Sequence, residues 1–407
     1  MIISDMWCLT QNIFGFESSG FVETMEESES IVKLRVARRL LAFFQLNGML
    51  LITHPRRVML EKVLMGLGAF YMGFLILSIS TAMYFLKLIF DMRNSLGLFM
   101  DVIQLAIPVS THFFILTQSF TKREFHRKIW EMFDGVEMSL RGNGIATAWN
   151  LRNFLVRYAT KFILLVGTAC GIEVAIIVII YPSNNGWKWH RMLAFTPFLG
   201  NRLCLMMLMF YTELYREFLQ IIVQELKKAA DLAHDEGAIE KPLNQFVLYQ
   251  KCKCLRRSFN MLWLINKYIN KSFGLSIFFN ITMNFIILIV DYYWNFKAFF
   301  LNSSANPLAS ILCSFPLIVC LIPFIQSCHS SFRPIPQIKH LISGLHLRGT
   351  PKHFGRFFKQ FSLQMLQLNS HLDASGFFTI NYELLHSVNP HSHLFPTQIN
   401  PSINISS

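Results

Sequence analysis

Charged residues are scarce in this chain of 407 residues: Asp, Glu, Lys and Arg make up 15% of it, against 53% hydrophobic residues. One soluble core cannot bury so much apolar surface, so the composition indicates a membrane protein. Acidic residues are the scarcer kind, which leaves a net charge of +13. Because the Lys and Arg residues lie in patches between long apolar stretches, this excess favours membrane topology over nucleic-acid binding.

The sequence also lacks the patterns of several other protein classes. It has no nucleophile elbow, phosphate-binding loop, dinucleotide fingerprint or HExxH helix, so we expect neither enzyme activity nor a cofactor. His391 and His393 lack a third ligand at a suitable spacing, so we expect no metal site. The first thirty residues show no cleavable signal peptide. The eight cysteines are scattered, and we expect no disulfide framework.

Six apolar stretches are long enough to cross a membrane as helices, which takes roughly 20 residues for a hydrocarbon core of about 30 Å. The predicted fold is therefore an all-α, polytopic transmembrane helical bundle. A shorter apolar piece at 40–52 is expected to lie along the inner membrane surface. The predicted spans are 63–86, 96–120, 154–181, 193–219, 273–296 and 308–327.

The distribution of Lys and Arg predicts the orientation, because positive residues are retained on the cytoplasmic side. They are numerous before the first span, between the second and third, and between the fourth and fifth, and few in the alternate loops. The amino terminus is therefore predicted to lie inside. An N-glycosylation pattern at Asn302 falls in a loop assigned to the outside, whereas the same pattern at Asn280 lies within a span. The predicted regions are a cytoplasmic region at 1–62, the six-span bundle at 63–327, a cytoplasmic segment at 328–388 and a polar, disordered tail at 389–407.

Ionisable residues inside spans are costly, so they are candidates for function. Glu173 and Arg202 lie about eight residues from the outer ends of neighbouring spans, and equal depth allows them to meet. One interpretation is an outward-facing ligand pocket; the other is that these two residues pair only to satisfy each other, while the aspartates mark helix ends. The predicted pocket residues are Asp101, Glu173, Asn201, Arg202 and Asp291, with Tyr211, Tyr292 and Trp294 as aromatic walls.

Three segments resemble the insect gustatory receptor family: Phe273-Gly274-Leu275-Ser276, Phe361-Ser362-Leu363-Gln364-Met365-Leu366, and Gly376-Phe377-Phe378-Thr379-Ile380-Asn381 with Leu384-Leu385. The topology is similar as well. The resemblance implies a tastant receptor in the plasma membrane of sensory neurons. It also implies a homo- or heterotetramer with other gustatory receptors that forms a ligand-gated cation channel, with seventh helices around a shared pore and the ligand pocket in the outer half of each bundle.

The chain departs from that family after Val388. The family continues into a seventh apolar helix, whereas the nineteen residues from Asn389 are polar and contain Pro390, Pro396 and Pro401. We therefore expect the seventh span to be missing, so that the chain builds no pore of its own. The causes that stay open are a frameshift that leaves a non-functional product, alternative splicing or a wrong reading frame, and a real short form that modulates full-length subunits.

Several other functions stay open. The related insect odorant receptors share the topology. A secondary transporter is expected to contain repeats and interrupted helices, and Pro316 and Pro323 are predicted to interrupt the sixth span. A G-protein-coupled receptor normally places its amino terminus outside, which the charge pattern disfavours.

Overall fold

The fold is known from a computed structural model, which describes residues 43–45, 47–49, 58–84, 95–145, 148–180, 185–234, 242–300, 307–347, 352–367 and 371–383. These residues are helical almost throughout, and the β-type pairing among them is an isolated bridge between Asp373 and Thr379. The helices are α3 (Val58–Tyr84), α5 (Ser95–Thr121), α6 (Arg123–Arg141), α7 (Ala148–Ala175) with the π-helical turn η1 (Ile176–Ile180), α8 (Asn185–His234), α10 (Pro242–Phe300), α11 (Pro307–Ser331), α12 (Pro334–Leu347) and α13 (Lys352–Gln367).

Each of the six predicted spans lies on a helix of the structure, in the order α3, α5, α7, α8, α10 and α11. Five described helices are long and apolar enough to cross a membrane, and α3 contributes a shorter apolar stretch, Lys62–Ser78. The prediction of an all-α, polytopic transmembrane bundle is therefore confirmed.

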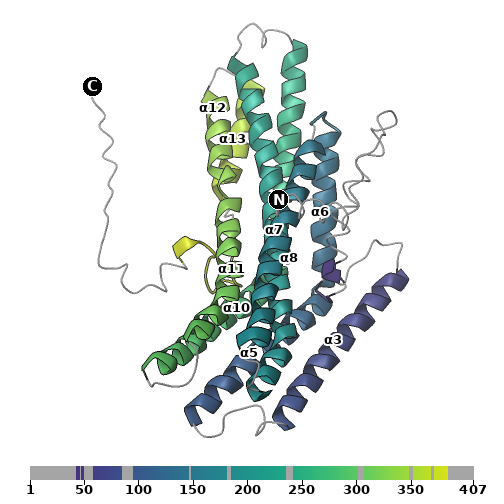
Figure 1. The fold of residues 1–407 in the computed structure, drawn as a ribbon. Coiled ribbons are helices and arrows are strands. Elements are labelled where there is room, and N and C mark those ends of the chain that lie inside the picture. The colour runs from purple at the N-terminus through teal and green to yellow at the C-terminus, as the bar shows by residue number, and fades with distance from the viewer. Residues whose placement is uncertain are drawn as a thin grey trace, which may run out of the picture.

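Two helices are much longer than a membrane crossing requires. α8 has 50 residues and α10 has 59, which correspond to about 75 Å and about 88 Å at a rise of 1.5 Å per residue. Figure 1 shows their long ends side by side in the upper half of the molecule, with α6 on one side and α12 and α13 on the other. The lower half contains α3, α5 and the predicted spans of the remaining helices.

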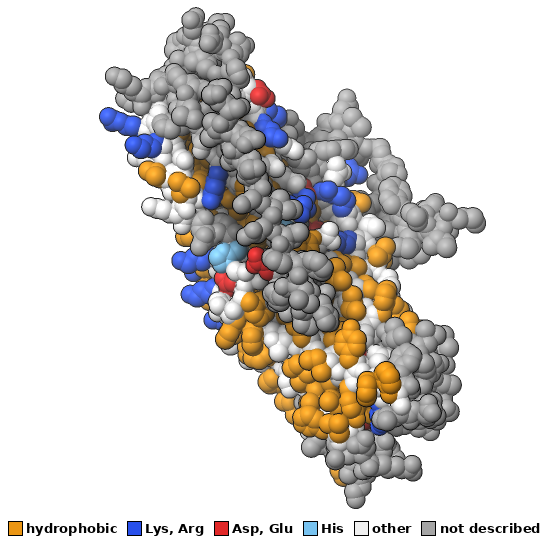
Figure 2. Space-filling model, turned by 90° about the vertical axis from the view of Figure 1, so that its left-hand side faces the viewer, with side chains coloured by type: hydrophobic (Ala, Val, Ile, Leu, Met, Phe, Trp, Pro, Cys, Tyr) orange, Lys and Arg blue, Asp and Glu red, His pale blue; other side chains and the backbone are white. Residues whose placement is uncertain are grey.

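The surface divides the molecule in the same way. In Figure 2 hydrophobic side chains cover the lower half of the face in view, whereas Lys and Arg gather in the upper half. Large apolar side chains such as Phe70, Leu77 and Ile289 are more than half exposed, as expected for residues that face lipid. The lower half is thus suited to hydrocarbon and the upper half to water.

α8 forms the centre of the bundle. Every residue from 201 to 212 is buried, so this part of the helix is enclosed on all sides. A helix that is buried all round is typical of the core of a large bundle. The polar residues on α8 must therefore find their partners on neighbouring helices.

Prolines lie within several of these helices without ending them. α5 contains Pro108, α8 contains Pro197, and α11 runs unbroken through Pro316 and Pro323. The prediction that the last two interrupt the sixth span is therefore wrong. A proline removes one backbone hydrogen bond, but in a membrane bundle neighbouring helices and local adjustments keep such a helix continuous.

One of the three segments that carry the family resemblance, at 273–276, lies on α10, and the other two contact this helix. The side-chain amide of Gln364 on α13 bonds Asn260, at 2.9 Å, and accepts a bond from Arg256 Nε at 3.1 Å. Phe377 stacks on Phe278, with ring centroids 4.5 Å apart. Gly274 allows the turn at 371–380 to approach closely, since a Cβ there would lie 2.6 Å from Ser375 Oγ. These motifs thus build one packing surface along α10.

The described part of the predicted surface segment at 40–52 packs into the bundle. Phe44 and Met49 are completely buried, and the Phe44 ring lies edge-on to Phe162 of α7 at 5.8 Å. Ser119 of α5 donates a hydrogen bond to the backbone carbonyl of Met49 at 2.9 Å. These contacts fix the segment against α5 and α7.

Candidate functional site

The predicted outer half of the bundle contains a buried ion pair between α7 and α8. Arg202 Nη2 lies 2.6 Å from Glu173 Oε1, and the two side chains are only 4% and 3% exposed. The structure thus pairs the two residues whose equal predicted depth in neighbouring spans allows a contact. Arg202 Nε and Nη1 have no hydrogen-bond partner among the described residues. Because Glu173 neutralises the charge of Arg202, the remaining donors suit a neutral acceptor better than a second anion.

A second polar contact connects α5, α10 and α11 near the predicted outer surface. Gln104 Nε2 donates to Asp291 Oδ1 at 3.1 Å, and Ser314 Oγ donates to Asp291 Oδ2 at 3.2 Å. Asp291 is buried, and Asp101 lies one helical turn before Gln104 on the same face of α5 and is buried too. This arrangement holds the predicted aspartates inside the protein, where water is scarce.

Asparagines connect α8 with α5 and α10 deeper in the bundle, since Asn280 precedes Asp291 by eleven residues on α10, about 16 Å along the axis. Asn201 Nδ2 donates to the carbonyl of Pro108 at 3.1 Å and lies 2.9 Å from the sulfur of Met283. Asn280 Nδ2 donates to the carbonyl of Asn201 at 2.9 Å, and Asn284 Nδ2 donates to Asn280 Oδ1 at 3.0 Å. The Asn201 side-chain oxygen has no partner among the described residues.

His112 of α5, which was not predicted, completes an outer polar layer formed by Asn201, Arg202, Asn280 and Asn284. Its side chain is buried, and neither ring nitrogen has a hydrogen-bond partner in the described part of the chain. The ring lies directly on Gly200 of α8, where an added Cβ would be 2.3 Å from His112 Cε1. An ionisable side chain within a predicted span is a candidate for function, so His112 could have been selected from the sequence.

The predicted aromatic walls do not join this layer. Tyr211 is buried nine residues beyond Arg202 on α8, about 13 Å along the axis, and its hydroxyl accepts a bond from Trp130 Nε1 at 2.8 Å. Tyr292 is 69% exposed. Trp294 packs on Tyr293 and carries Lys297 over its ring at 4.7 Å. Asn302, the predicted glycosylation site, lies outside the described residues.

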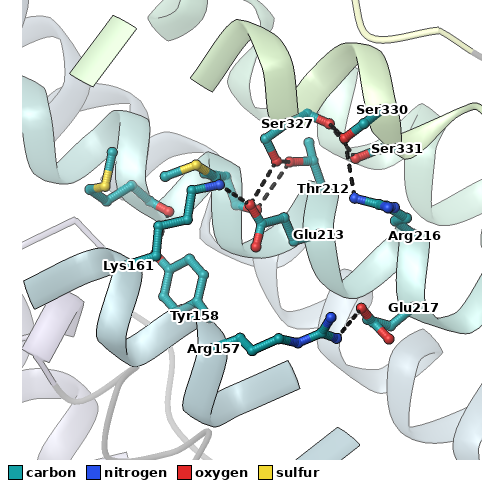
Figure 3. Close-up of polar contacts among 12 residues, drawn as sticks. Arg157, Tyr158, Lys161, Thr212, Glu213, Arg216, Glu217, Ser327, Ser330 and Ser331 are labelled. Carbon is teal, nitrogen blue, oxygen red and sulfur yellow. Dashed lines mark hydrogen bonds and ion pairs between the residues drawn. The ribbon is translucent and has the colours of Figure 1, made fainter. Parts of the chain in front are cut away.

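A second polar network lies at the other end of the spans and was missed entirely. It connects α7, α8 and α11 through Lys161, Glu213 and Ser327 (Figure 3). Lys161 Nζ is 2.6 Å from Glu213 Oε1, and Ser327 Oγ donates to the same oxygen at 3.2 Å. The Ser327 hydroxyl also lies 3.3 Å from that of Thr212. One carboxylate therefore holds three helices together.

The rim of this network carries further basic residues. Arg157 pairs with Glu217 at 2.7 Å, and Arg216 Nη1 donates to Ser330 Oγ at 3.4 Å (Figure 3). Tyr158 OH donates to the carbonyl of Met206 at 2.6 Å. This network is the same kind of contact as the Glu173 and Arg202 pair, because two antiparallel spans place opposite charges at equal depth.

The upper half contains one strongly perturbed histidine. His126 of α6 is buried against the Phe273 ring, with centroids 4.5 Å apart. Burial lowers the pKa of His126 to about 3, because the charged form is poorly solvated there. This imidazole is therefore neutral at physiological pH and acts as part of the contact between α6 and α10.

The described residues contain no group of three or more His, Cys, Asp or Glu side chains that could hold a metal ion. What the outer layer offers instead is hydrogen bonding in an apolar setting: donors on Arg202, an acceptor on Asn201 and both functions on His112. Such an arrangement suits recognition of a small molecule.

These features define an all-helical, multi-pass membrane protein with a buried polar layer in one half of its bundle. A family model described as the 7tm chemosensory receptor matches residues 37–388. The chain belongs to the 7tm chemosensory receptor family. No curated protein matches it.

Two similar solved structures are of the insect olfactory receptor OR5 from Machilis hrabei. The first has a TM-score of 0.65 and 11% identity and covers 92% of this chain and 100% of that chain. The second, in complex with eugenol, has a TM-score of 0.59 and 11% identity and covers 88% of this chain and 96% of that chain. At this identity the likeness shows the fold alone, and it is consistent with the family membership.

Proposed function

We propose that the protein is a gustatory receptor subunit that binds a small organic molecule in the outer polar layer and thereby opens a cation channel in an assembly with other gustatory receptor subunits. The observation that carries the proposal is the family match from residue 37 to residue 388, which covers the whole helical bundle. The buried donors and acceptors of α5, α8 and α10 supply a ligand site within that bundle. Ligand binding shifts a closed-to-open equilibrium only if the ligand binds the open form more tightly.

The olfactory alternative is supported by the two solved relatives, one of which holds eugenol. Taste is favoured by the segments around Phe273, Phe361 and Gly376, which resemble gustatory receptors. In either case the functional unit is an oligomer of receptor subunits in the plasma membrane of a sensory neuron. The unbroken helix α11 gives no support to the transporter alternative.

Expression in oocytes tests the proposal. The chain is expressed alone and together with a second gustatory receptor subunit, and membrane currents are recorded under voltage clamp while sugars, bitter compounds and volatile alcohols are applied. The expected result is a cation current that depends on one ligand class and is reduced at least tenfold by Arg202→Met with Glu173→Gln. The double change removes both charges of the buried pair, which avoids leaving one of them unpaired. Surface expression that matches the parent chain, with no ligand-dependent current in either setting, would exclude the proposal.

A further inference from the structure

In the outer polar layer, His112 and Asn201 are buried and have hydrogen-bonding atoms without a partner among the described residues. His112 is 3% exposed and Asn201 is 0% exposed. Both ring nitrogens of His112 and the side-chain oxygen of Asn201 lack a partner among the described residues. An unsatisfied buried polar group lowers stability, so two such residues in one contact call for an explanation.

The two side chains lie in the same contact between α5 and α8. Asn201 bonds the carbonyl of Pro108, which is one helical turn before His112 on α5. The His112 ring lies on the backbone of Gly200, the neighbour of Asn201. The two residues therefore belong to one contact between these helices, with the His112 ring on the residue next to Asn201.

The chemistry of these free atoms selects one kind of partner. A neutral imidazole has one N–H donor and one bare nitrogen acceptor, and the free amide oxygen of Asn201 is a further acceptor. A hydroxyl group both accepts and donates, so it can accept a hydrogen bond from the imidazole N–H and donate one to an acceptor. An ether or carbonyl group lacks the donor, and an ammonium group lacks the acceptor.

Charged ligands are disfavoured at this position. Glu173 takes up the charge of Arg202 on the α7 side, and Asp101 and Asp291 lie eleven residues from His112 and Asn280, about 16 Å along their helices. A charged ligand group at this contact would therefore have no described counter-charge beside it, and an uncompensated charge at membrane depth is costly.

The surroundings are otherwise apolar, which suits a ligand with a hydrocarbon body. A cluster of buried side chains from α5, α8, α10 and α11 surrounds the contact; its members include Leu105, Val109, Phe198, Met283, Ile287 and Leu317. A small molecule with one hydroxyl and an apolar body matches both the polar atoms and this cluster.

We infer that His112 and Asn201 recognise the hydroxyl group of an uncharged alcohol or phenol. This inference rests on the proposed function and names the ligand class of that same layer. A site that leaves its own polar groups unpaired discriminates strongly against an analogue without the hydroxyl. The loss of one such hydrogen bond corresponds to a preference of about tenfold or more.

Matched alcohol and ether probes test the inference by direct binding to the purified full chain in nanodiscs. Thermal unfolding is followed with benzyl alcohol against benzyl methyl ether, and with eugenol against its methyl ether. The alcohol of at least one pair is expected to bind at least tenfold more tightly than the ether. His112→Phe should abolish that preference and leave ether binding within about threefold, whereas Thr111→Val, a buried neighbour on α5, should keep it.

Equal binding of alcohol and ether in both pairs, binding of neither, or an unchanged preference in His112→Phe would overturn the inference. If His112→Phe does not fold, a diazirine-bearing alcohol crosslinked to the parent chain decides the matter: adducts within 104–116 and 194–205 support the site, and adducts confined to other helices refute it. Because binding needs no current, a preference for alcohols without any current contradicts the channel proposal and leaves the site intact. A ligand-dependent current without a preference for alcohols overturns the inference and leaves the channel proposal intact.

Discussion

At the scale of single residues, Gly200 of α8 allows the His112 ring of α5 to lie against its backbone. An added Cβ would lie 2.3–2.7 Å from three ring atoms of His112, and that ring is itself buried. Gly200→Ala should therefore destabilise the protein by about 1–3 kcal/mol through overpacking, despite the higher helix propensity of alanine. The measurement is the midpoint of thermal unfolding of the purified protein in detergent.

Gly171→Ala on α7 is the matched control, because an added Cβ there meets nothing within 4 Å. It should leave the midpoint unchanged or raise it slightly. Replacing His112 by Ser in the Gly200→Ala background should restore much of the loss. A Gly200→Ala protein as stable as the parent would show that α5 and α8 are less closely packed than described.

Equal depth of charged residues in neighbouring antiparallel spans correctly predicted that Glu173 and Arg202 meet. The same rule fits Lys161 and Glu213, which lie about seven and about six residues from the predicted inner ends of the same two spans. That pair was visible in the sequence and was overlooked.

At the scale of elements, α10 holds the turn at 371–380 by contacts that join distant parts of the sequence. Asn270 Nδ2 bonds the carbonyl of His371 at 3.0 Å and Asp373 Oδ2 at 3.3 Å. Ser375 and Gly376 have φ values of 54° and 82°, which give the turn its left-handed bend over Gly274. The turn therefore depends on α10 for its position.

Gly274→Ala should release this turn from α10. The new Cβ would lie 2.8 Å from Ser375 N and 3.1 Å from its Cα, and backbone atoms cannot avoid it by a change of rotamer. Hydrogen exchange followed by mass spectrometry should show faster exchange, by at least about tenfold, across 371–380 and little change in 201–212. Gly344→Ala on α12, with nothing within 4 Å, is the control. Unchanged protection of the turn in Gly274→Ala would contradict this packing.

The helices themselves were easier to predict than their contacts. Runs of about 20 apolar residues predicted six spans, and each of these lies on a helix of the structure, because the cost of exposing backbone groups to lipid leaves few alternatives. The rotation of each helix is not determined by such runs, since lipid-facing and buried sides are both apolar. Tyr292 was therefore assigned to the pocket and is exposed, and His112 was passed over and is buried beside Gly200. The long ends of α8 and α10 beyond the membrane were not predicted either.

At the scale of the whole molecule, the lower half of the surface is apolar and the upper half is charged, so one half suits the membrane and the other suits water on one side of it. The segments rich in Lys and Arg between the second and third and between the fourth and fifth predicted spans contain α6 and the long ends of α8 and α10. These elements lie in the charged half (Figures 1 and 2). Because basic loops are retained in the cytoplasm, this half is expected to lie inside, together with the amino terminus. The outer polar layer would then lie in the half of the membrane nearer to the extracellular medium.

Epitope tags in living cells test this orientation. A tag at the amino terminus should bind antibody only after permeabilisation, and a tag placed between Ala305 and Asn306 should bind it in intact cells. The same cells report on Asn302: endoglycosidase treatment should shift the parent chain on a gel and leave Asn302→Gln unchanged. The tagged chains must reach the surface at parental levels for the comparison to hold. An amino-terminal tag that is accessible in intact cells would reverse the orientation, and ligands would then have to reach the His112 layer from the cytoplasm.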